Sequence, residues 1–217
     1  MSTNIRNHRG FRWFTLVILA AALVIFASLA SARAKTNLCK VCPVSAVKSH
    51  ATNSLGEAQS GGTCSTGKGA NGYPIPDPKC TPGAYNPTVT PEVFGSKKFT
   101  TKCVRDCLTT GAEKKKAYQH YRIKQNSSCE LDHLVPLEMG GADSLDNIWP
   151  QCGKAPNGKN YKDIKDSVEQ YLAIQVVLGK KDWETARASI AKDWTQFIAE
   201  EETFCATNHC DIADYRK

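Results

Sequence analysis

The sequence lacks the extremes of composition that mark several protein classes. Charged residues make up 23% of its 217 residues and hydrophobic residues make up 41%. These values exclude a wholly disordered chain and a multi-span membrane protein. The sequence also contains no internal repeat. What remains is a globular protein of one domain, or of one domain with an appendage, that is large enough to bury a core.

The N-terminus has the layout of a secretory signal peptide. Three arginines precede an apolar run from Trp13 to Ala30, and small residues follow with a cleavage site after Ala34. We therefore expect residues 1–34 to be removed, leaving a secreted or periplasmic protein with no stable membrane association. The run is about 18 residues long, which is also the lower limit for a membrane-spanning helix, so an uncleaved membrane anchor is the alternative.

A second C-x-x-C motif is missing, which bears on the role of the cysteines. Cys39 and Cys42 could form a redox pair or half of a zinc site, but no second pair supplies the other half. All ten cysteines lie beyond residue 34. An even and dense set of cysteines in an exported chain indicates structural disulfides, although their connectivity does not follow from the sequence.

Positive charge is unevenly distributed along the chain. The formal net charge is +7, but residues 1–34 contain four arginines and no acidic residue. Residues 96–125 hold nine basic side chains and two acidic ones, whereas residues 126–217 are net acidic. A basic stretch could contact a phosphate backbone without sequence preference, or it could be a solvated surface. The candidate nucleic-acid contacts in this stretch are Lys114, Lys115, Lys116, Arg122 and Lys124.

The chain divides into a loop-dominated segment and a segment with regular elements. Residues 35–95 are rich in Gly, Ser, Pro, Asn and Thr without sustained periodicity, which predicts loops held by cysteines. Residues 96–217 are predicted to form an α+β domain with a basic helix from Ala112 to about Lys124 and short strands within 129–136 and at 148–149.

Two further helices are predicted at the C-terminal end. The first has an apolar stripe between Ile164 and Val176 and ends at Gly179, a typical C-cap. The second begins after Asp182 as N-cap, with a stripe that continues to Ile198. The tryptophans on these apolar segments are predicted to be core residues, namely Trp149, Trp183 and Trp194.

The residues that could carry chemistry lie around the two short strands. Asp132 and His133 end the first strand, and Asn147 follows fourteen residues after the histidine. Phosphodiester hydrolysis needs a nucleophile, which an imidazole can generate as a general base, and relief of charge, which a divalent metal can supply. Asp132 and an Asn carbonyl are suitable oxygen ligands for Mg²⁺. Asn147 could hold the tautomer of the imidazole.

Two stretches of this region resemble a known family. The run from Glu130 to Gly141 and the run from Asp146 to Pro150 resemble the HNH endonucleases, most of all their exported bacterial branch. The resemblance covers roughly residues 129–170, and more loosely 80–200. It implies an α+β fold with a ββα-metal (HNH) core, additional helices and a disulfide-rich, loop-dominated N-terminal segment.

The resemblance also implies roles for single residues. His133 would be the general base, Asp132 a metal ligand, and Asn147 the residue that orients the base and braces the hairpin. For the third family position on the helix, Asn160 is the candidate ligand and Asn157 the alternative. Either asparagine could instead be a helix N-cap. The implied cofactor is one divalent metal ion, Mg²⁺ in the first place, with Mn²⁺ or another divalent ion as alternatives.

Taken together, these features predict a secreted or periplasmic, metal-dependent endonuclease of low sequence specificity that acts on DNA, with RNA as the alternative substrate. Two other functions stay open. One is a non-catalytic exported module that binds DNA or another polyanion through the basic stretch. The other is a cell-envelope protein in which residues 35–95 carry the main interaction.

Overall fold

A computed structural model describes residues 44, 46–49, 51–58, 63–105 and 111–217, with the backbone alone for residues 111–114. All of these residues belong to one unit, Val41–Lys217. The predicted signal peptide, the side chain of Lys114 and three of the cysteines (Cys39, Cys42 and Cys107) lie outside the described residues. In the described part, no helix is both long enough and apolar enough to span a membrane.

The fold is α+β, with helices packed around small antiparallel sheets. The segment before residue 95 contributes two short strand pairs and a single helical turn. Strand β1 (Asn53–Ser54) pairs with β4 (Ala84–Tyr85), and β2 (Gly67–Lys68) pairs with β3 (Pro74–Ile75). Helix α2 (Pro91–Phe94) and a 3₁₀ turn at Thr101–Cys103 follow.

The hairpin that carries Asp132 and His133 consists of β5 (Cys129–His133) and β6 (Ile148–Cys152). The two strands are antiparallel, and the connection between them contains 3₁₀ turns at Leu137–Met139 and Leu145–Asn147. Cys129 and Cys152 face each other at one end of the register and are joined by a disulfide. The disulfide therefore fixes the register at the end of the hairpin opposite His133.

Helix α3 (Gly111–His120) is the predicted basic helix, but it ends earlier than Lys124. Arg122 has φ 51°, and the Ile123 amide donates to the Tyr118 carbonyl at 3.0 Å while the Arg122 amide donates to Gln119 at 3.1 Å. These two bonds form a Schellman motif, in which a left-handed residue stops the helix. The prediction was wrong here because an arginine occupies the position that glycine usually takes.

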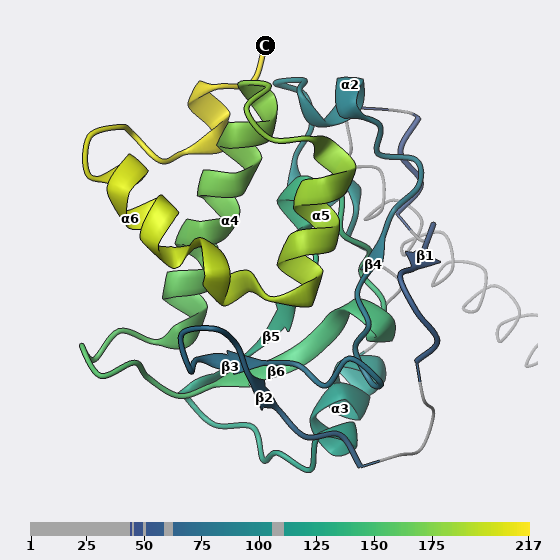
Figure 1. Ribbon diagram of the computed structural model, residues 1–217. Coiled ribbons are helices and arrows are strands. Elements are labelled where there is room, and N and C mark those ends of the chain that lie inside the picture. Colours follow the sequence, from purple (N-terminus) through teal and green to yellow (C-terminus); the bar gives the residue numbers. More distant parts are fainter. Residues whose placement is uncertain (1–43, 45, 50, 59–62, 106–110) are drawn as a thin grey trace, which may run out of the picture. The chain divides into compact units, whose positions relative to one another are not determined.

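The predicted C-terminal helices are present, with one break. Helix α4 (Tyr161–Val177) is followed by Gly179 at φ 69°, and α5 (Trp183–Lys192) begins after Asp182, whose carboxylate accepts from the Thr185 amide at 2.8 Å. The predicted second stripe is not one helix, because Asp193 is extended and caps a new 3₁₀ turn (Trp194–Phe197), which leads into α6 (Ile198–Cys205). Figure 1 shows α6 and α5 on either side of α4.

The core lies between these helices and the hairpin. Both α3 and α4 contact β6, and α4 also packs against α5 and α6. The prediction that the three tryptophans are core residues is confirmed, since Trp149 and Trp194 are fully buried and Trp183 is 7% exposed. Burial of such large side chains is typically the main stabilising contribution in a domain of this size.

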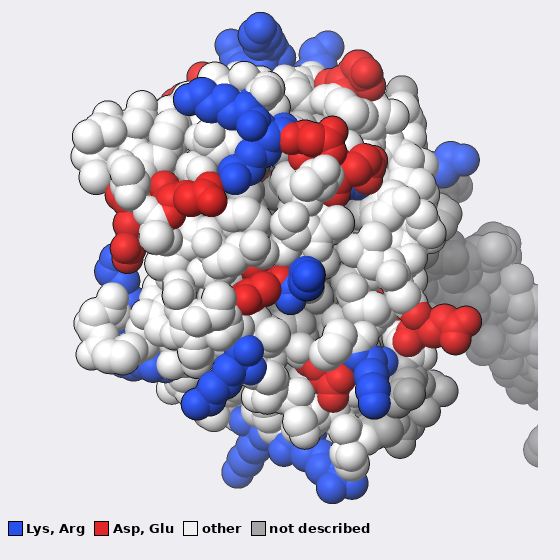
Figure 2. Space-filling model, in the orientation of Figure 1, with Lys and Arg blue, Asp and Glu red and all other residues white. Residues whose placement is uncertain are grey.

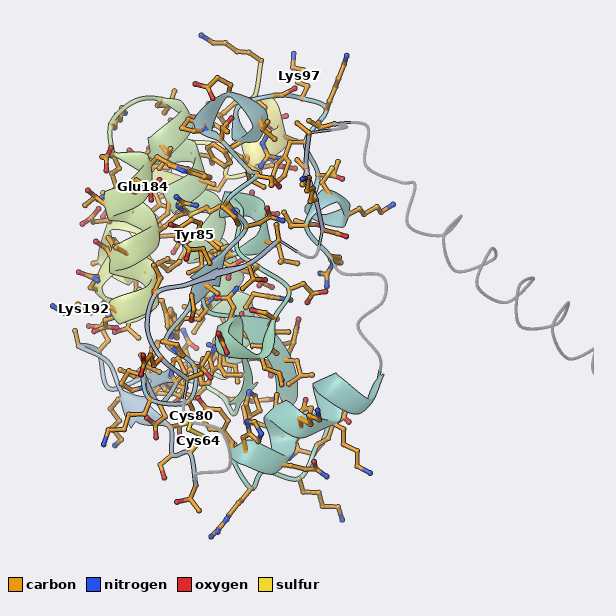
Figure 3. All side chains as sticks on the ribbon, turned by 90° about the vertical axis from the view of Figure 1, so that its right-hand side faces the viewer. Cys64, Cys80, Tyr85, Lys97, Glu184 and Lys192 are labelled. Atoms are coloured by element: carbon orange, nitrogen blue, oxygen red, sulfur yellow. A yellow bond between two sulfur atoms is a disulfide. The ribbon has the colours of Figure 1, made fainter. Side chains whose placement is uncertain are left out.

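The predicted loop segment is packed onto the helices, and its described part contains the Cys64–Cys80 disulfide. The Trp194 indole donates to the Pro74 carbonyl at 2.9 Å, and the Arg187 guanidinium lies 4.2 Å from the centre of the Tyr85 ring. Figure 3 shows Tyr85 beside α5 and Cys64 close to Cys80. The expected structural disulfides are confirmed for three pairs, which are Cys64–Cys80, Cys129–Cys152 and Cys205–Cys210.

Candidate active site at the end of the hairpin

Asn147 is the structural centre of the hairpin connection. Its side chain is fully buried, and its Oδ1 accepts from the amides of Val135 (2.8 Å) and Ala84 (3.2 Å). Its Nδ2 donates to the carbonyls of Val135 and Ala142, both at 2.9 Å. All four hydrogen-bonding positions of the amide are therefore used by backbone groups. Asn147 braces the hairpin, as the resemblance implies, but among the described residues it makes no hydrogen bond to an imidazole.

Asp143 occupies the position next to His133 that was expected for Asn147. The His133 Nε2 atom lies 2.8 Å from Asp143 Oδ1, and the side chains are 13% and 5% exposed. Because a carboxylate only accepts, Nε2 carries the hydrogen of this bond. In the neutral imidazole, Nδ1 is then the unprotonated nitrogen, and in the described part of the chain no hydrogen bond occupies it. Asp143 thus fixes the tautomer that a general base requires.

The Gly140-Gly141 turn reverses the chain so that Asp143 reaches the His133 ring. A Cβ atom on Gly141 would lie 1.9 Å from the Val135 carbonyl oxygen, and Gly140 has φ 72°. The Gly141 amide donates to the Pro136 carbonyl at 2.8 Å. No other residue fits the close backbone approach at Gly141, so this turn, and with it the His133–Asp143 pair, depends on glycine.

Asp132 is buried beside His133 and is held by groups from two elements. The Trp149 indole donates to Asp132 Oδ2 at 2.7 Å. The Lys165 ammonium, from α4, lies 3.2 Å from Oδ1 and 3.0 Å from Oδ2. Lys165 also donates to the His133 carbonyl at 2.9 Å and forms an ion pair with Glu169. The fully buried Lys165 therefore joins two carboxylates and the end of β5 in one cluster.

Charges in this cluster shift several pKa values. Burial alone would lower the pKa of Lys165, but the charges of Asp132 and Glu169 outweigh it and raise that pKa. Burial raises the pKa of Glu169 well above its ordinary value despite the neighbouring ammonium. Burial, with the charge of Asp132, raises the pKa of Asp166 to about 6. The Lys165 ammonium is thus surrounded by carboxyl groups, and two of them, those of Asp166 and Glu169, ionise less readily than an ordinary carboxyl group.

A cavity of about 410 Å³ opens beside these residues. His133 and Asp132 line it, together with Arg105 from the basic stretch. The cavity is otherwise rich in carboxyl groups, which are those of Glu130, Glu138, Asp166 and Glu169. The negative charge is partly balanced, because Glu130 pairs with Lys162 at 3.2 Å and Lys165 pairs with Asp132 and Glu169. The cavity can therefore present a base and one guanidinium to a bound group.

Neither candidate for the third metal ligand lines this cavity. Asn160 stands at the N-cap position of α4 without a capping bond from its side chain, and its Nδ2 donates to Asp163 at 2.7 Å. Asn157 lies in the loop before α4, where its Oδ1 accepts from the Lys159 amide at 3.1 Å. Among the described residues, no group of three or more His, Cys, Asp or Glu side chains is arranged to hold a metal ion.

A second hollow of about 740 Å³ lies next to α3. Three of the candidate nucleic-acid contacts line it, which are Lys115, Arg122 and Lys124. Lys116 is exposed on the same helix but does not line the hollow. Leu131 lines both hollows, so the basic groove and the cavity at His133 adjoin at β5. Figure 2 shows basic side chains along the lower edge of its face, on the side where Figure 1 draws α3.

Sequence reasoning missed Asp143 and Lys165 as parts of the site. Nothing in the local sequence pattern links Asp143 to His133, which lies ten residues earlier. Lys165 did carry a signal, because it lies three residues before Val168 and seven before Leu172 on the apolar stripe of α4. A lysine on such a stripe is rarely buried without a charged partner.

Comparisons with protein-family models, with curated proteins and with solved structures find no match to this chain.

Proposed function

We propose that the protein is an exported endonuclease that hydrolyses phosphodiester bonds of nucleic acid with low sequence specificity, with DNA as the first candidate substrate and RNA as the alternative. The observation that carries this proposal is the pairing of His133, which lines the cavity, with Asp143. The bond from Nε2 to Asp143 leaves Nδ1 as the proton-accepting nitrogen. A base of this kind is needed to activate water for attack on phosphorus.

The proposed reaction uses few groups of the chain. A water molecule gives one proton to Nδ1 of His133 as its oxygen attacks phosphorus, and the bond from phosphorus to the leaving sugar oxygen breaks. The departing oxygen takes up a proton from the imidazolium or from solvent. Asp143 stabilises the imidazolium that forms in between. Arg105 is the basic side chain of the cavity lining that can neutralise charge on the phosphate.

The order of elements supports the more specific assignment to a ββα-metal core. β5, β6 and α4 follow one another along the chain, with Asp132 and His133 at the end of the first strand and Asn147 directly before the second. This is the arrangement that the resemblance to HNH endonucleases implies.

The expected metal does not fit the side chains as they are arranged. Both carboxylate oxygens of Asp132 are engaged by Trp149 and Lys165, and the Asn160 amide is bonded to Asp163. No step of the proposed reaction therefore uses a metal ion. The dependence on Mg²⁺ or Mn²⁺ remains a separate prediction that an EDTA control decides.

The position of the basic groove supports a nucleic acid as substrate. Lys115, Arg122 and Lys124 rim a hollow whose floor includes the apolar side chains of Tyr118 and Leu131. Phosphates can pair with the rim while bases lie on the apolar floor, as in other sequence-tolerant sites. Because Leu131 also borders the cavity, a strand in the groove would extend toward His133.

The carboxyl-rich lining of the cavity is the observation that favours the second candidate, a non-catalytic module. In that case the basic groove alone would bind DNA or another polyanion. Such binding would be sensitive to salt and would survive the loss of His133, and no strand would be cleaved.

A plasmid-nicking assay on the oxidised protein without residues 1–34, run with and without EDTA, tests the proposal. His133→Ala should reduce the rate by roughly 10²–10⁴-fold, which is the usual contribution of a general base. His209→Ala is the matched control, because His209 is also paired with a carboxylate but lies 76% exposed in the C-terminal tail. Undiminished cleavage by His133→Ala would overturn the mechanism, and DNA binding without any cleavage by the wild type would favour the binding module.

A further inference from the structure

Lys165 is the most deeply buried charged residue near the candidate active site. Its side chain is 0% exposed, and its ammonium has three donor hydrogens. The acceptors are the Asp132 carboxylate, the His133 carbonyl and the Glu169 carboxylate. An oxygen-lined position with two carboxylates and a carbonyl is the kind of environment that a hard metal cation occupies in other proteins. Here it is filled by a cation of the chain itself.

The position of this ammonium matters because Asp132 is the residue that was expected to bind a metal. Lys165 Nζ lies within 3.2 Å of both oxygens of that carboxylate. A divalent ion bound to Asp132 would stand next to a positive charge that has no exit to solvent, and the repulsion would be strong in this buried setting. Glu169, the other carboxylate within reach, is held by the same lysine.

We propose that Lys165 replaces the metal ion at Asp132, so that the chain holds a fixed internal cation there and binds no divalent ion at this position. Lys165 is a positioning residue and not a catalytic one, since it does not line the cavity. It neutralises the buried carboxylates, and its bond to the His133 carbonyl ties α4 to the strand that carries the base. If the proposed function is correct, cleavage is consequently independent of added divalent metal at this site.

The inference predicts that removal of the ammonium creates a metal site. In Lys165→Met the side chain keeps an unbranched apolar stem as far as the ε position but loses the ammonium, so Asp132 and Glu169 lose their counter-ion with Asp166 close by. Carboxylate oxygens without a cation bind Mn²⁺ well, and Mn²⁺ can be detected directly.

The test is a Mn²⁺ titration followed by electron paramagnetic resonance, without substrate, on the folded and oxidised protein. The wild type should show no saturable binding into the millimolar range. Lys165→Met should gain one saturable Mn²⁺ site whose Kd lies at least about tenfold below the highest concentration at which the wild type shows no binding. A second substitution, Asp132→Asn, should remove this site. The matched control is Lys162→Met. Lys162 lies on the same helix as Lys165 and also pairs with two carboxylates, those of Glu130 and Asp163. Its position is partly exposed, so its loss should create no such site.

Saturable Mn²⁺ binding by the wild type that Asp132→Asn abolishes would overturn the inference, and so would a folded Lys165→Met variant that gains no site. If Lys165→Met does not fold, the wild-type titration still decides. The metal titration needs no substrate, so it separates this inference from the proposed function. A wild type without nuclease activity and without Mn²⁺ binding refutes only the function, whereas an EDTA-sensitive nuclease with Asp132-dependent Mn²⁺ binding refutes only the inference.

Discussion

Two histidine–carboxylate pairs in the described residues share their chemistry and differ in their surroundings. His133 and Asp143 are held at the end of the hairpin with little exposure. His209 and Asp214 lie in the C-terminal tail, where they are 76% and 57% exposed, next to the Cys205–Cys210 disulfide. Water screens the charges of the second pair and competes for its hydrogen bond. The same two residue types therefore constitute a candidate site only where the backbone around them is fixed.

The largest expected difference between the two regions concerns stability. Asn147→Ala removes four buried hydrogen bonds and leaves the backbone groups of Val135, Ala84 and Ala142 without partners. The free energy of unfolding should fall by roughly 4 kcal/mol, since each buried unpaired group typically costs about 1–3 kcal/mol. Urea denaturation measures the loss. Asn208→Ala, in the exposed tail, is the control and should change stability by less than about 0.5 kcal/mol. A loss below about 1 kcal/mol for Asn147→Ala would contradict the bracing role.

The second prediction compares the carboxylates of the two pairs. Asp143→Asn keeps the shape of the side chain but removes the charge that stabilises the His133 imidazolium, so single-turnover cleavage should slow by about 10²-fold. Asp214→Asn should leave the rate unchanged. Nitrogen-15 chemical shifts of the His133 ring report the tautomer directly. An unchanged tautomer and an unchanged rate in Asp143→Asn would show that the buried pair is no different from the exposed one.

Much of this frame could be predicted from local sequence pattern. The strand that ends in Asp132-His133, the C-cap at Gly179 and the N-cap at Asp182 all lie where periodicity and capping chemistry predict them. Such features depend on residues only a few positions apart, so they can be recognised in the sequence.

The contacts that define the site could not be predicted in this way. Lys165 meets Asp132 across 33 residues, and Asp143 meets His133 across the hairpin connection. Local pattern also missed the early end of α3 at His120, where Arg122 takes the left-handed conformation that glycine usually takes, and the break at Asp193, which caps a new turn. Contacts between residues far apart in the sequence determine these pairings, and local propensity carries no information about them.

The third prediction concerns the basic groove and a distant basic surface. Lys115→Gln combined with Lys124→Gln should weaken binding of a labelled oligonucleotide about tenfold and reduce the salt dependence of log Kd by about two. Fluorescence anisotropy on a His133→Ala background measures binding without cleavage. Lys97→Gln combined with Lys98→Gln is the control, since Figure 3 shows Lys97 at the end of the molecule away from α3. Equal losses from both double variants would mean that the groove has no special role.

The smallest expected effect comes from Asp166, whose pKa of about 6 reflects burial first and the charge of Asp132 second, with Glu130 adding to the increase and Lys165 and Lys162 opposing it. This folded-state pKa lies above the ordinary value of 3.8. The folded protein therefore holds the proton more tightly, and the associated stability is lost as the pH rises from about 4 through 6. Above pH 6 the ionised carboxylate also adds negative charge to the cavity that must admit a phosphate.

KM for a short oligonucleotide should consequently rise several-fold between pH 5 and pH 7 in the wild type, and Asp166→Asn should remove this part of the pH dependence. Asp163→Asn is the control on the same helix. The hydrogen bond from Lys162 lowers the pKa of Asp163, which does not line the cavity, so its loss should leave the KM profile unchanged. If Asp166→Asn and the wild type show the same KM profile, the charge of the cavity does not govern substrate binding. The buried histidine pair would then differ from the exposed one only in how firmly the base is oriented.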